Sequence, residues 1–136
     1  MSEALEPSPL VLVADDELLI LEIIEQALES GGFATVPAIN GQEAHVHLGA
    51  HGHAIRALIT DIRMGEGPDG WEIARRAREL NPRLPVIYMS GDSAADWSAQ
   101  GVPGSIMLQK PFASAQIVTA VASLINQAES ALRPAN

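Results

Sequence analysis

Three carboxylates and one amine follow short apolar segments of the chain that are typical of β-strands. Asp15 and Asp16 follow one such segment, Asp61 ends a second and Lys110 follows a third. If these strands lie parallel in one sheet, the four side chains meet at its carboxyl edge, where open α/β sheets bind ligands. Hard carboxylate oxygens without histidine or cysteine in the matching loops favour Mg²⁺ over zinc or copper. The sequence therefore predicts a magnesium site at this edge.

The same cluster has the composition of a phosphoryl-acceptor site. Mg²⁺ is usually held by one or two carboxylates, so a third carboxylate is left as a nucleophile. An aspartate that attacks phosphorus becomes an acyl phosphate, whose charge needs a metal, an ammonium and small donor groups around it. Lys110 can supply the ammonium, and Ser90, at the end of another apolar segment, can supply a hydroxyl. An Asp-Asp pair after a strand is also common at a helix N-terminus, but the coincidence of all four signals favours a site.

Composition limits the classes of protein to which the chain can belong. Its 136 residues fit one domain, and 47% hydrophobic with 18% charged residues is typical of a globular chain. A net charge of −9 argues against a nucleic-acid or anionic-membrane partner. The absence of cysteine excludes disulfides and thiolate chemistry and is compatible with the cytoplasm, our predicted location. We also predict no signal peptide and no membrane span.

The elements that must position the cluster alternate between strand and helix, which is the signature of a parallel α/β sheet. The apolar runs and turn residues predict strands at 10–14, 33–37, 57–60, 85–89 and 105–108, and helices at 17–30, 42–50, 71–80, 93–100 and 114–131. We expect a doubly wound, five-stranded parallel sheet with helices on both faces. Residues 1–9 are predicted to form a flexible N-terminal arm, residues 10–129 the domain and residues 130–136 a C-terminal tail.

Over about residues 9–127 the chain resembles the receiver domains of response regulators in bacterial two-component signalling, of the single-domain, chemotaxis-regulator-like kind. The resemblance rests on Val11-Leu12-Val13-Ala14-Asp15-Asp16-Glu17, Leu58-Ile59-Thr60-Asp61-Ile62-Arg63-Met64, Asp69-Gly70-Trp71-Glu72, Pro85-Val86-Ile87-Tyr88-Met89-Ser90-Gly91 and Lys110-Pro111-Phe112. It implies a flavodoxin-like (βα)5 sheet with the strand order 2-1-3-4-5.

The resemblance also implies a role for each residue of the cluster. Asp61 would accept a phosphoryl group from a phosphohistidine on a sensor histidine kinase or a histidine phosphotransfer protein. Asp16 would bind Mg²⁺ directly, and Arg63 would bind it through its backbone carbonyl. Asp15 would bind it through a water molecule rather than directly. By this resemblance the protein is not an enzyme acting on external substrates, because it catalyses only its own phosphorylation and dephosphorylation.

Two further residues would contact the phosphoryl group, and one position departs from the family. Ser90 and Lys110 would each bind a phosphoryl oxygen, while the isomer of the Lys110–Pro111 bond stays open. Phosphorylation would pull Ser90 inward and an aromatic residue on the fifth strand would fill the vacated space. Met107 occupies that position here. Methionine is flexible and fills gaps readily, so the usual aromatic switch is in question.

The residues after Ser90 and Asp61 are expected to modulate the site. Gly91 and Asp92 follow Ser90, and Arg63 lies two residues after the phosphoacceptor. In the family such positions flank the path of the hydrolytic water. We hypothesise that Arg63 and Asp92 pair across the mouth of the site and slow hydrolysis; the alternative is two solvated charges that contribute little.

Output is expected through protein contacts, because the predicted domain accounts for nearly the whole chain and leaves no DNA-binding module. The predicted output face comprises the helix at 93–100, the strand at 105–108 and the helix at 114–131, and the predicted state is a monomer or weak dimer. An unphosphorylated interaction module or a phosphate-relay intermediate stays open as an alternative, because Met107 makes switching atypical.

Two other classes fit the sequence less well. A haloacid-dehalogenase-type phosphatase needs a second aspartate two residues after the nucleophile, where this chain has Arg63. A flavodoxin-like cofactor binder needs a phosphate-cradling loop, which the acidic residues after the first strand would repel. His47 and His51 have the i, i+4 spacing of a helical metal pair, but a solvated helix end is the favoured interpretation.

Overall fold

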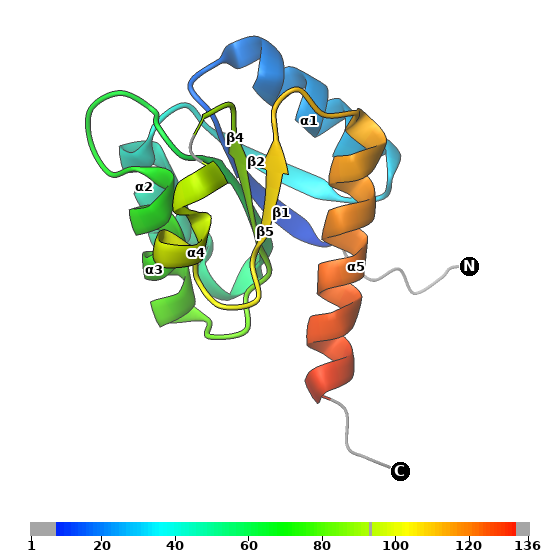
Figure 1. The fold of residues 1–136 in the computed structure, drawn as a ribbon. Coiled ribbons are helices and arrows are strands. Elements are labelled where there is room, and N and C mark those ends of the chain that lie inside the picture. The colour runs from blue at the N-terminus through cyan, green and yellow to red at the C-terminus, as the bar shows by residue number, and fades with distance from the viewer. Residues whose placement is uncertain (1–7, 93, 133–136) are drawn as a thin grey trace.

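A computed structural model describes residues 8–92 and 94–132 (Figure 1). Most of the predicted arm and tail, residues 1–7 and 133–136, lies outside this range, as does Ser93. The strands are β1 (Leu10–Ala14), β2 (Ala34–Ala38), β3 (Ile55–Asp61), β4 (Val86–Ser90) and β5 (Ile106–Gln109). The helices are α1 (Leu18–Ser30), α2 (Gly41–His51), α3 (Gly70–Leu80), α4 (Trp97–Gln100) and α5 (Ser114–Leu132), with 3-10 turns at Gly52–Ala54 and Ala94–Asp96.

All strand pairs in the sheet are parallel, and the strand order is β2-β1-β3-β4-β5, which confirms the predicted topology. β1, β3 and β4 each pair on both sides, while β2 and β5 form the edges. The edge position explains why β2 tolerates Pro37, since a proline lacks one donor for the ladder. The order also reverses between β1 and β3, which is where ligands bind in sheets of this kind.

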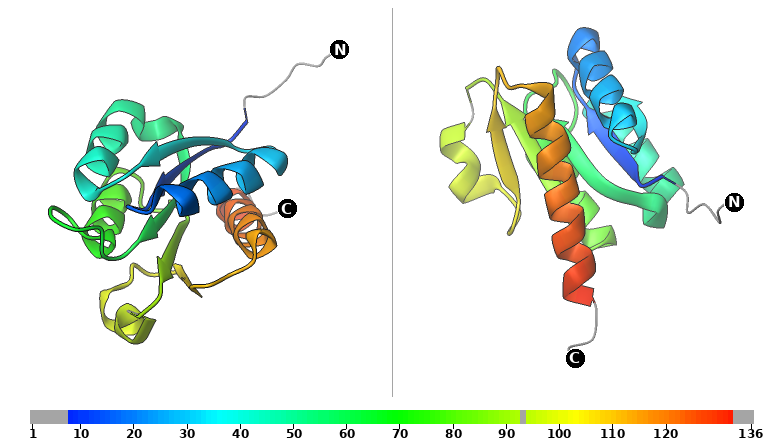
Figure 2. Two further views of the ribbon diagram at one scale, coloured as in Figure 1. Left: turned by 90° about the horizontal axis from the view of Figure 1, so that it is seen from above. Right: turned by 90° about the vertical axis from the view of Figure 1, so that its right-hand side faces the viewer.

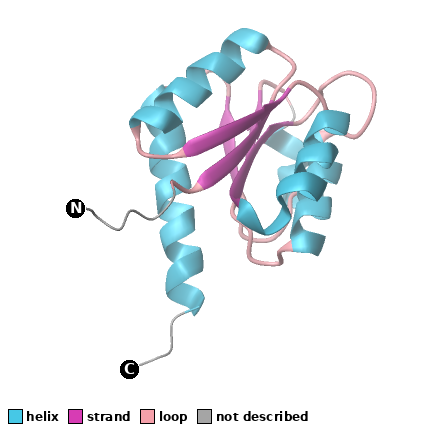
Figure 3. Cartoon of the chain, turned by 180° about the vertical axis from the view of Figure 1, so that it is seen from behind, coloured by secondary structure: helices cyan, strands magenta, loops and turns pink. Residues whose placement is uncertain are grey.

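Helices cover both faces of the sheet (Figures 2 and 3). Successive strand residues point to opposite faces, so Leu12 and Leu58 enter the core under α2 and α3, whereas Val13 and Ile59 enter the core under α1 and α5. Because β1 and β3 are covered on both sides, they read as near-continuous apolar runs. Their polar residues are therefore confined to the strand ends.

Most element boundaries differ from prediction by one residue, and the differences at β3, α4 and α5 bear on the site and the output surface. β3 begins at Ile55 and includes Asp61 itself. The fourth helix was predicted to span 93–100, yet α4 is a single turn after a 3-10 turn. It ends at Gly101, where an added Cβ would lie 2.4 Å from the Trp97 ring, and the chain then turns toward β5. α5 extends to Leu132, so residues 130–132 are helical rather than part of a tail.

No helix in the described part of the chain combines the length and apolar character needed to cross a membrane.

Candidate functional site

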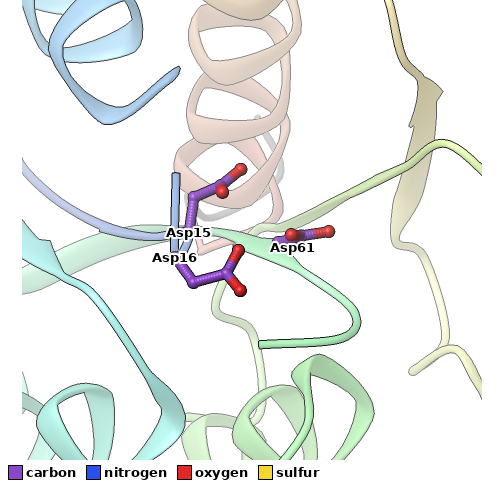
Figure 4. Close-up of side chains that lie close together, drawn as sticks. All are labelled: Asp15, Asp16 and Asp61. Carbon is purple, nitrogen blue, oxygen red and sulfur yellow. The ribbon is translucent and has the colours of Figure 1, made fainter. Parts of the chain in front are cut away.

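The ends of β1 and β3 bring the three predicted carboxylates together. Ala14 pairs with Thr60 in the β1–β3 register, so Asp15 and Asp61 are the next residues along two adjacent strands. Oxygen atoms of Asp15, Asp16 and Asp61 all lie within 4.8 Å of one another, and the three side chains extend toward a common region (Figure 4). Asp15 and Asp61 are buried, whereas Asp16 faces solvent.

Lys110, the residue directly after β5, joins this group. Its Nζ lies 3.0 Å from Asp15 Oδ2, 3.5 Å from Asp61 Oδ2 and 3.4 Å from Glu17 Oε1. The backbone N–H of Lys110 donates to the carbonyl of Ser90 at 2.7 Å, which ties the end of β5 to the end of β4. The peptide bond between Lys110 and Pro111 is cis. We call Asp15, Asp16, Asp61 and Lys110 the acidic site.

Burial makes the two buried carboxylates of the acidic site, Asp15 and Asp61, costly to ionise. Burial, reinforced by the charge of Asp15, raises the pKa of Asp61 to about 6, although Lys110 and the Ile62 N–H oppose the shift. Burial likewise raises the pKa of Asp15, against hydrogen bonds from the Glu17 N–H and Lys110. A cation bound among these groups would relieve this cost.

The ammonium of Lys110 is held in its charged form. Burial alone would lower the pKa of Lys110, but the hydrogen bond and charge of Asp15, with the charges of Asp61 and Glu17, outweigh burial and raise it. One ammonium among three carboxylates leaves the acidic site with an excess of negative charge. Hard oxygen ligands with excess negative charge fit a divalent ion such as Mg²⁺.

The backbone of Asp61 is held as firmly as its side chain. Asp61 Oδ1 accepts a hydrogen bond from the N–H of Ile62 at 2.8 Å. The Asp61 carbonyl accepts from the buried hydroxyl of Thr60, also at 2.8 Å. These bonds orient Asp61 so that its other oxygen, Oδ2, is the one that approaches Lys110. Thr60 was not predicted to have a role. A hydroxyl-bearing residue directly before Asp61 was the signal in the sequence that could have indicated one.

The other predicted site residues lie around the acidic site. Ser90 ends β4 one residue beyond Met89, the register partner of Asp61, and its side chain is buried. Its Oγ accepts from the N–H of Asp92 at 3.1 Å. Gly91, Asp92 and Arg63 are exposed. Their predicted roles, including that of the Arg63 carbonyl, stay predictions.

Met107, the residue at the expected switch position, is half-buried on β5. It pairs in register with Tyr88 and packs on the core under α2 and α3. Tyr88 is fully buried, and its hydroxyl accepts from the N–H of Val102 at 3.0 Å. Ser105 Oγ in turn donates to the Val102 carbonyl at 2.6 Å and accepts from Trp97 Nε1 at 2.9 Å. A polar network thus links β4 to α4 beside Met107.

The sequence did not predict this network or the contact of Glu17 with Lys110. A tyrosine in a buried strand was the available signal, because a buried phenol needs a hydrogen-bond partner. Glu17 was recognised as part of an acidic run, but no spacing in the sequence indicates that its side chain reaches β5. Both features depend on how loops pack in the folded chain.

The histidine pair of α2 does not form a comparable site. The rings of His47 and His51 stack with centroids 5.8 Å apart. Within residues 8–92 and 94–132, however, Asp15, Asp16 and Asp61 are the group in which three or more such ligands converge. The pair therefore offers two ligands only, in keeping with the favoured interpretation of a solvated helix end.

Comparison with known proteins identifies the family to which the fold belongs. Residues 11–122 match the response regulator receiver domain family. A crystal structure of a response regulator receiver protein from Sinorhizobium medicae WSM419 is 44% identical, with a TM-score of 0.86, and covers 89% of this chain and 97% of that one. The response regulator receiver protein CpdR of Brucella abortus is 29% identical over 117 residues, covering 85% of this chain and 95% of CpdR.

Longer relatives contain the same domain. The transcriptional regulatory protein PrrA of Mycobacterium bovis is 31% identical over 122 residues, which cover 88% of this chain and 51% of PrrA. The chain therefore spans about half the length of the first curated relatives that it matches. With a parallel five-stranded sheet, an acidic site at its carboxyl edge and these matches, the chain belongs to the response regulator receiver domain family. Such domains are the receiver modules of two-component response regulators.

Proposed function

We propose that this protein is phosphorylated on Asp61 by a phosphohistidine of a sensor histidine kinase or a histidine phosphotransfer protein. One observation carries the proposal. Oxygen atoms of Asp15, Asp16 and Asp61 lie within 4.8 Å of one another, and Lys110 Nζ lies 3.0 Å from Asp15 and 3.5 Å from Asp61, although these residues come from three separate segments of the chain. Such a group is costly to assemble, because each buried charge loses hydration. It is explained if the group binds a cation and a phosphoryl group.

In the proposed reaction a carboxylate oxygen of Asp61 attacks phosphorus. The oxygen–phosphorus bond forms as the phosphorus–nitrogen bond breaks, and the electron pair of that bond stays on the imidazole nitrogen, which then takes up a proton. Oδ2 of Asp61 is the proposed attacking atom, since Oδ1 accepts from the Ile62 N–H. A pKa of about 6 leaves Asp61 mostly ionised at neutral pH, as a nucleophile requires.

The surrounding residues are proposed to stabilise the transferred charge. Asp15, Asp16 and Asp61, with the Arg63 carbonyl, would hold Mg²⁺, which when bound offsets the negative charge of the phosphoryl oxygens. Lys110 would exchange its contact with Asp15 for one with a phosphoryl oxygen. Ser90 would donate its hydroxyl to another.

The rim of the acidic site supports a protein phosphodonor. Leu18 and Leu19 are 66% and 68% exposed, and Ile39 is 42% exposed. Leu18 and Ile39 line one hollow of about 620 Å³ together with Asp16 and Met64. Apolar side chains beside a carboxylate of the acidic site suit a helical protein partner that presents its phosphohistidine at the rim. We propose the cytoplasm as the location and the face of α4, β5 and α5 as the output surface.

The second candidate is a phosphate-relay intermediate or interaction module with atypical switching. Met107 favours it, because no aromatic side chain occupies the position that rotates in the family. We also keep the hypothesis that Arg63 and Asp92 slow hydrolysis of the aspartyl phosphate. Arg63→Ala and Asp92→Ala would shorten the phosphoryl lifetime, and unchanged lifetimes in both would reject that hypothesis.

The proposed function is tested by intact mass. Wild-type protein incubated with acetyl phosphate and Mg²⁺ should gain the mass of one phosphoryl group, and the gain should disappear without Mg²⁺ or in Asp61→Asn. A wild-type protein that gains no mass, or an Asp61→Asn variant that gains as much, would reject the proposal.

A further inference from the structure

The loop of residues 62–69 carries the Arg63 carbonyl and connects Asp61 to α3 (Figure 1). We call it the site loop. Gly65 and Gly67 have φ of 79° and 94°, and residues 65–67 are exposed. A loop with this composition has little local structure of its own. Ile62 and Met64, on either side of Arg63, are buried in the core under α2 and α3. The path of the site loop is therefore set by this packing together with the backbone contacts near its two ends.

The first residue of the site loop, Ile62, is held against the start of α3. The N–H of Gly70 donates to the carbonyl of Ile62 at 2.8 Å. A Cβ added at Gly70 would lie 2.1 Å from the carbonyl oxygen of Asp61 and 3.0 Å from its carbonyl carbon. The backbone of the phosphoacceptor therefore rests directly on the first residue of α3.

Near its other end, at Pro68, the site loop rests on a different helix, α2. A Cβ added at Gly41 would lie 2.1 Å from the carbonyl oxygen of Pro68 and 2.9 Å from its carbonyl carbon. Gly41 is the first residue of α2, and its position is fixed by reciprocal capping: Asn40 Oδ1 accepts from the N–H of Glu43, and Glu43 Oε1 accepts from the N–H of Ile39. Two fixed backbones thus meet with no room for a side chain.

We propose that Gly41 is a positioning residue for the acidic site. It seats the site loop so that the Arg63 carbonyl lies where the metal binds. The proposal rests on the proposed function, since it assumes that the acidic site binds Mg²⁺. It assigns a role to α2, a helix that contributes no side chain to the acidic site.

The size of the expected loss in Mg²⁺ affinity follows from the distances around Gly41. A methyl group at Gly41 has to be about 1 Å or more further from the Pro68 carbonyl to reach the ordinary contact distance of 3.4 Å. The atoms that the added Cβ would meet are chiefly backbone atoms of Pro68, so the site loop itself must shift. Loss of a group that supports a metal ligand typically weakens metal binding about 10- to 100-fold, and a misplacement of about 1 Å can slow a reaction about 100-fold.

The test compares two glycines of the same helix. Gly41→Ala is the variant and Gly49→Ala the matched control, because no atom lies within 4 Å of a Cβ added at Gly49. Mg²⁺ affinity is measured by isothermal titration calorimetry, and stability by urea unfolding. Gly41→Ala should bind Mg²⁺ about tenfold or more weakly, and high Mg²⁺ should partly restore its phosphorylation by acetyl phosphate. Gly49→Ala should bind Mg²⁺ as wild type does.

A second variant covers the case in which Gly41→Ala does not fold. Pro68→Gly changes the same contact from the site loop instead of from α2, so α2 stays intact. This variant should also bind Mg²⁺ more weakly. Mg²⁺ affinity within twofold of wild type in each folded variant, or equal weakening in Gly49→Ala, would overturn the inference. Failure of the proposed function looks different: the wild-type protein itself would neither bind Mg²⁺ nor accept a phosphoryl group.

Discussion

The central strands β1 and β3 differ sharply from β5, which forms one edge of the sheet, and from α4, which precedes it. Most residues of β1 and all but one of β3 are buried, whereas three of the four residues of β5 are half-buried and the last is exposed. α4, which precedes β5, is a single turn. The carboxylates of the acidic site come from the first region and Met107 from the second. The carboxylates thus lie at the ends of two largely buried strands, and the predicted output surface includes the least buried strand.

The difference has a simple physical origin. β1 and β3 pair on both sides and are covered by helices on both faces, so Asp15 and Asp61 at their ends are desolvated and the pKa values of these two residues rise. β5 is an edge strand, and an edge strand leaves side chains and backbone groups in reach of a partner. The first region therefore tolerates little change, while the second can vary with the partner.

The strongest test of the buried region is the charge of Asp61. A raised pKa means that the ionised carboxylate destabilises the native protein, an effect that is full above about pH 6 and is lost as pH falls toward the ordinary value of 3.8. Asp61→Asn should therefore raise the free energy of unfolding of the metal-free protein by about 1–3 kcal/mol at pH 7. Urea unfolding at pH 7 and pH 4 measures this.

Asp16→Asn is the matched control for this prediction, because Asp16 is exposed. It should change the free energy of unfolding by less than about 0.5 kcal/mol. Equal stability of Asp61→Asn and Asp16→Asn at pH 7 would show that Asp61 carries no burial cost.

Tyr88→Phe probes a hydrogen bond that anchors the segment between α4 and β5 to the buried strand β4. The variant leaves the buried N–H of Val102 without its acceptor, and this should cost about 1–2 kcal/mol in the free energy of unfolding. Phosphorylation of Asp61 should be unchanged, because the network lies outside the acidic site. Trp97→Phe, which removes a bond made by a 38% exposed side chain, should cost less. A Tyr88→Phe protein as stable as wild type would show that the network does not anchor α4.

The pH dependence of Mg²⁺ binding tests the acidic site again, with a smaller effect. Carboxylates must be ionised to bind the cation, and the pKa of Asp61 is about 6. Mg²⁺ affinity should be constant above about pH 7 and should fall about tenfold by one pH unit below that pKa. Calorimetric titration at pH 7.5 and pH 5.0 is the measurement, and equal affinities at both would contradict the raised pKa.

Met107→Leu should have the smallest effect. Leucine conserves the volume of methionine, so the free energy of unfolding should change by less than about 1.5 kcal/mol. The rate of phosphorylation by acetyl phosphate should stay within twofold, since Met107 packs on the core under α2 and α3 and does not belong to the acidic site. A large loss of phosphorylation rate would show that the two regions are coupled more tightly than their packing indicates.

The sequence predicted the strands, their order and the acidic site, because strand ends in a parallel sheet share one edge and the motifs around Asp61 and Lys110 resemble those of a known family. It did not predict the contact of Gly41 with Pro68 or the network around Tyr88. These contacts join residues far apart in the chain, and no periodicity encodes them. The helix predicted at 93–100 was also wrong in part, because Ala94–Asp96 form a 3-10 turn and α4 begins only at Trp97.

A crystal structure of the protein with Mg²⁺ and beryllofluoride, a phosphoryl analogue, tests the central claim most directly. We predict beryllium bonded to a carboxylate oxygen of Asp61, a metal ion beside Asp15 and Asp16, and Lys110 Nζ in contact with a fluorine atom. Beryllofluoride bound to another residue, or Asp61 left bare while the metal occupies a different place, would contradict the account.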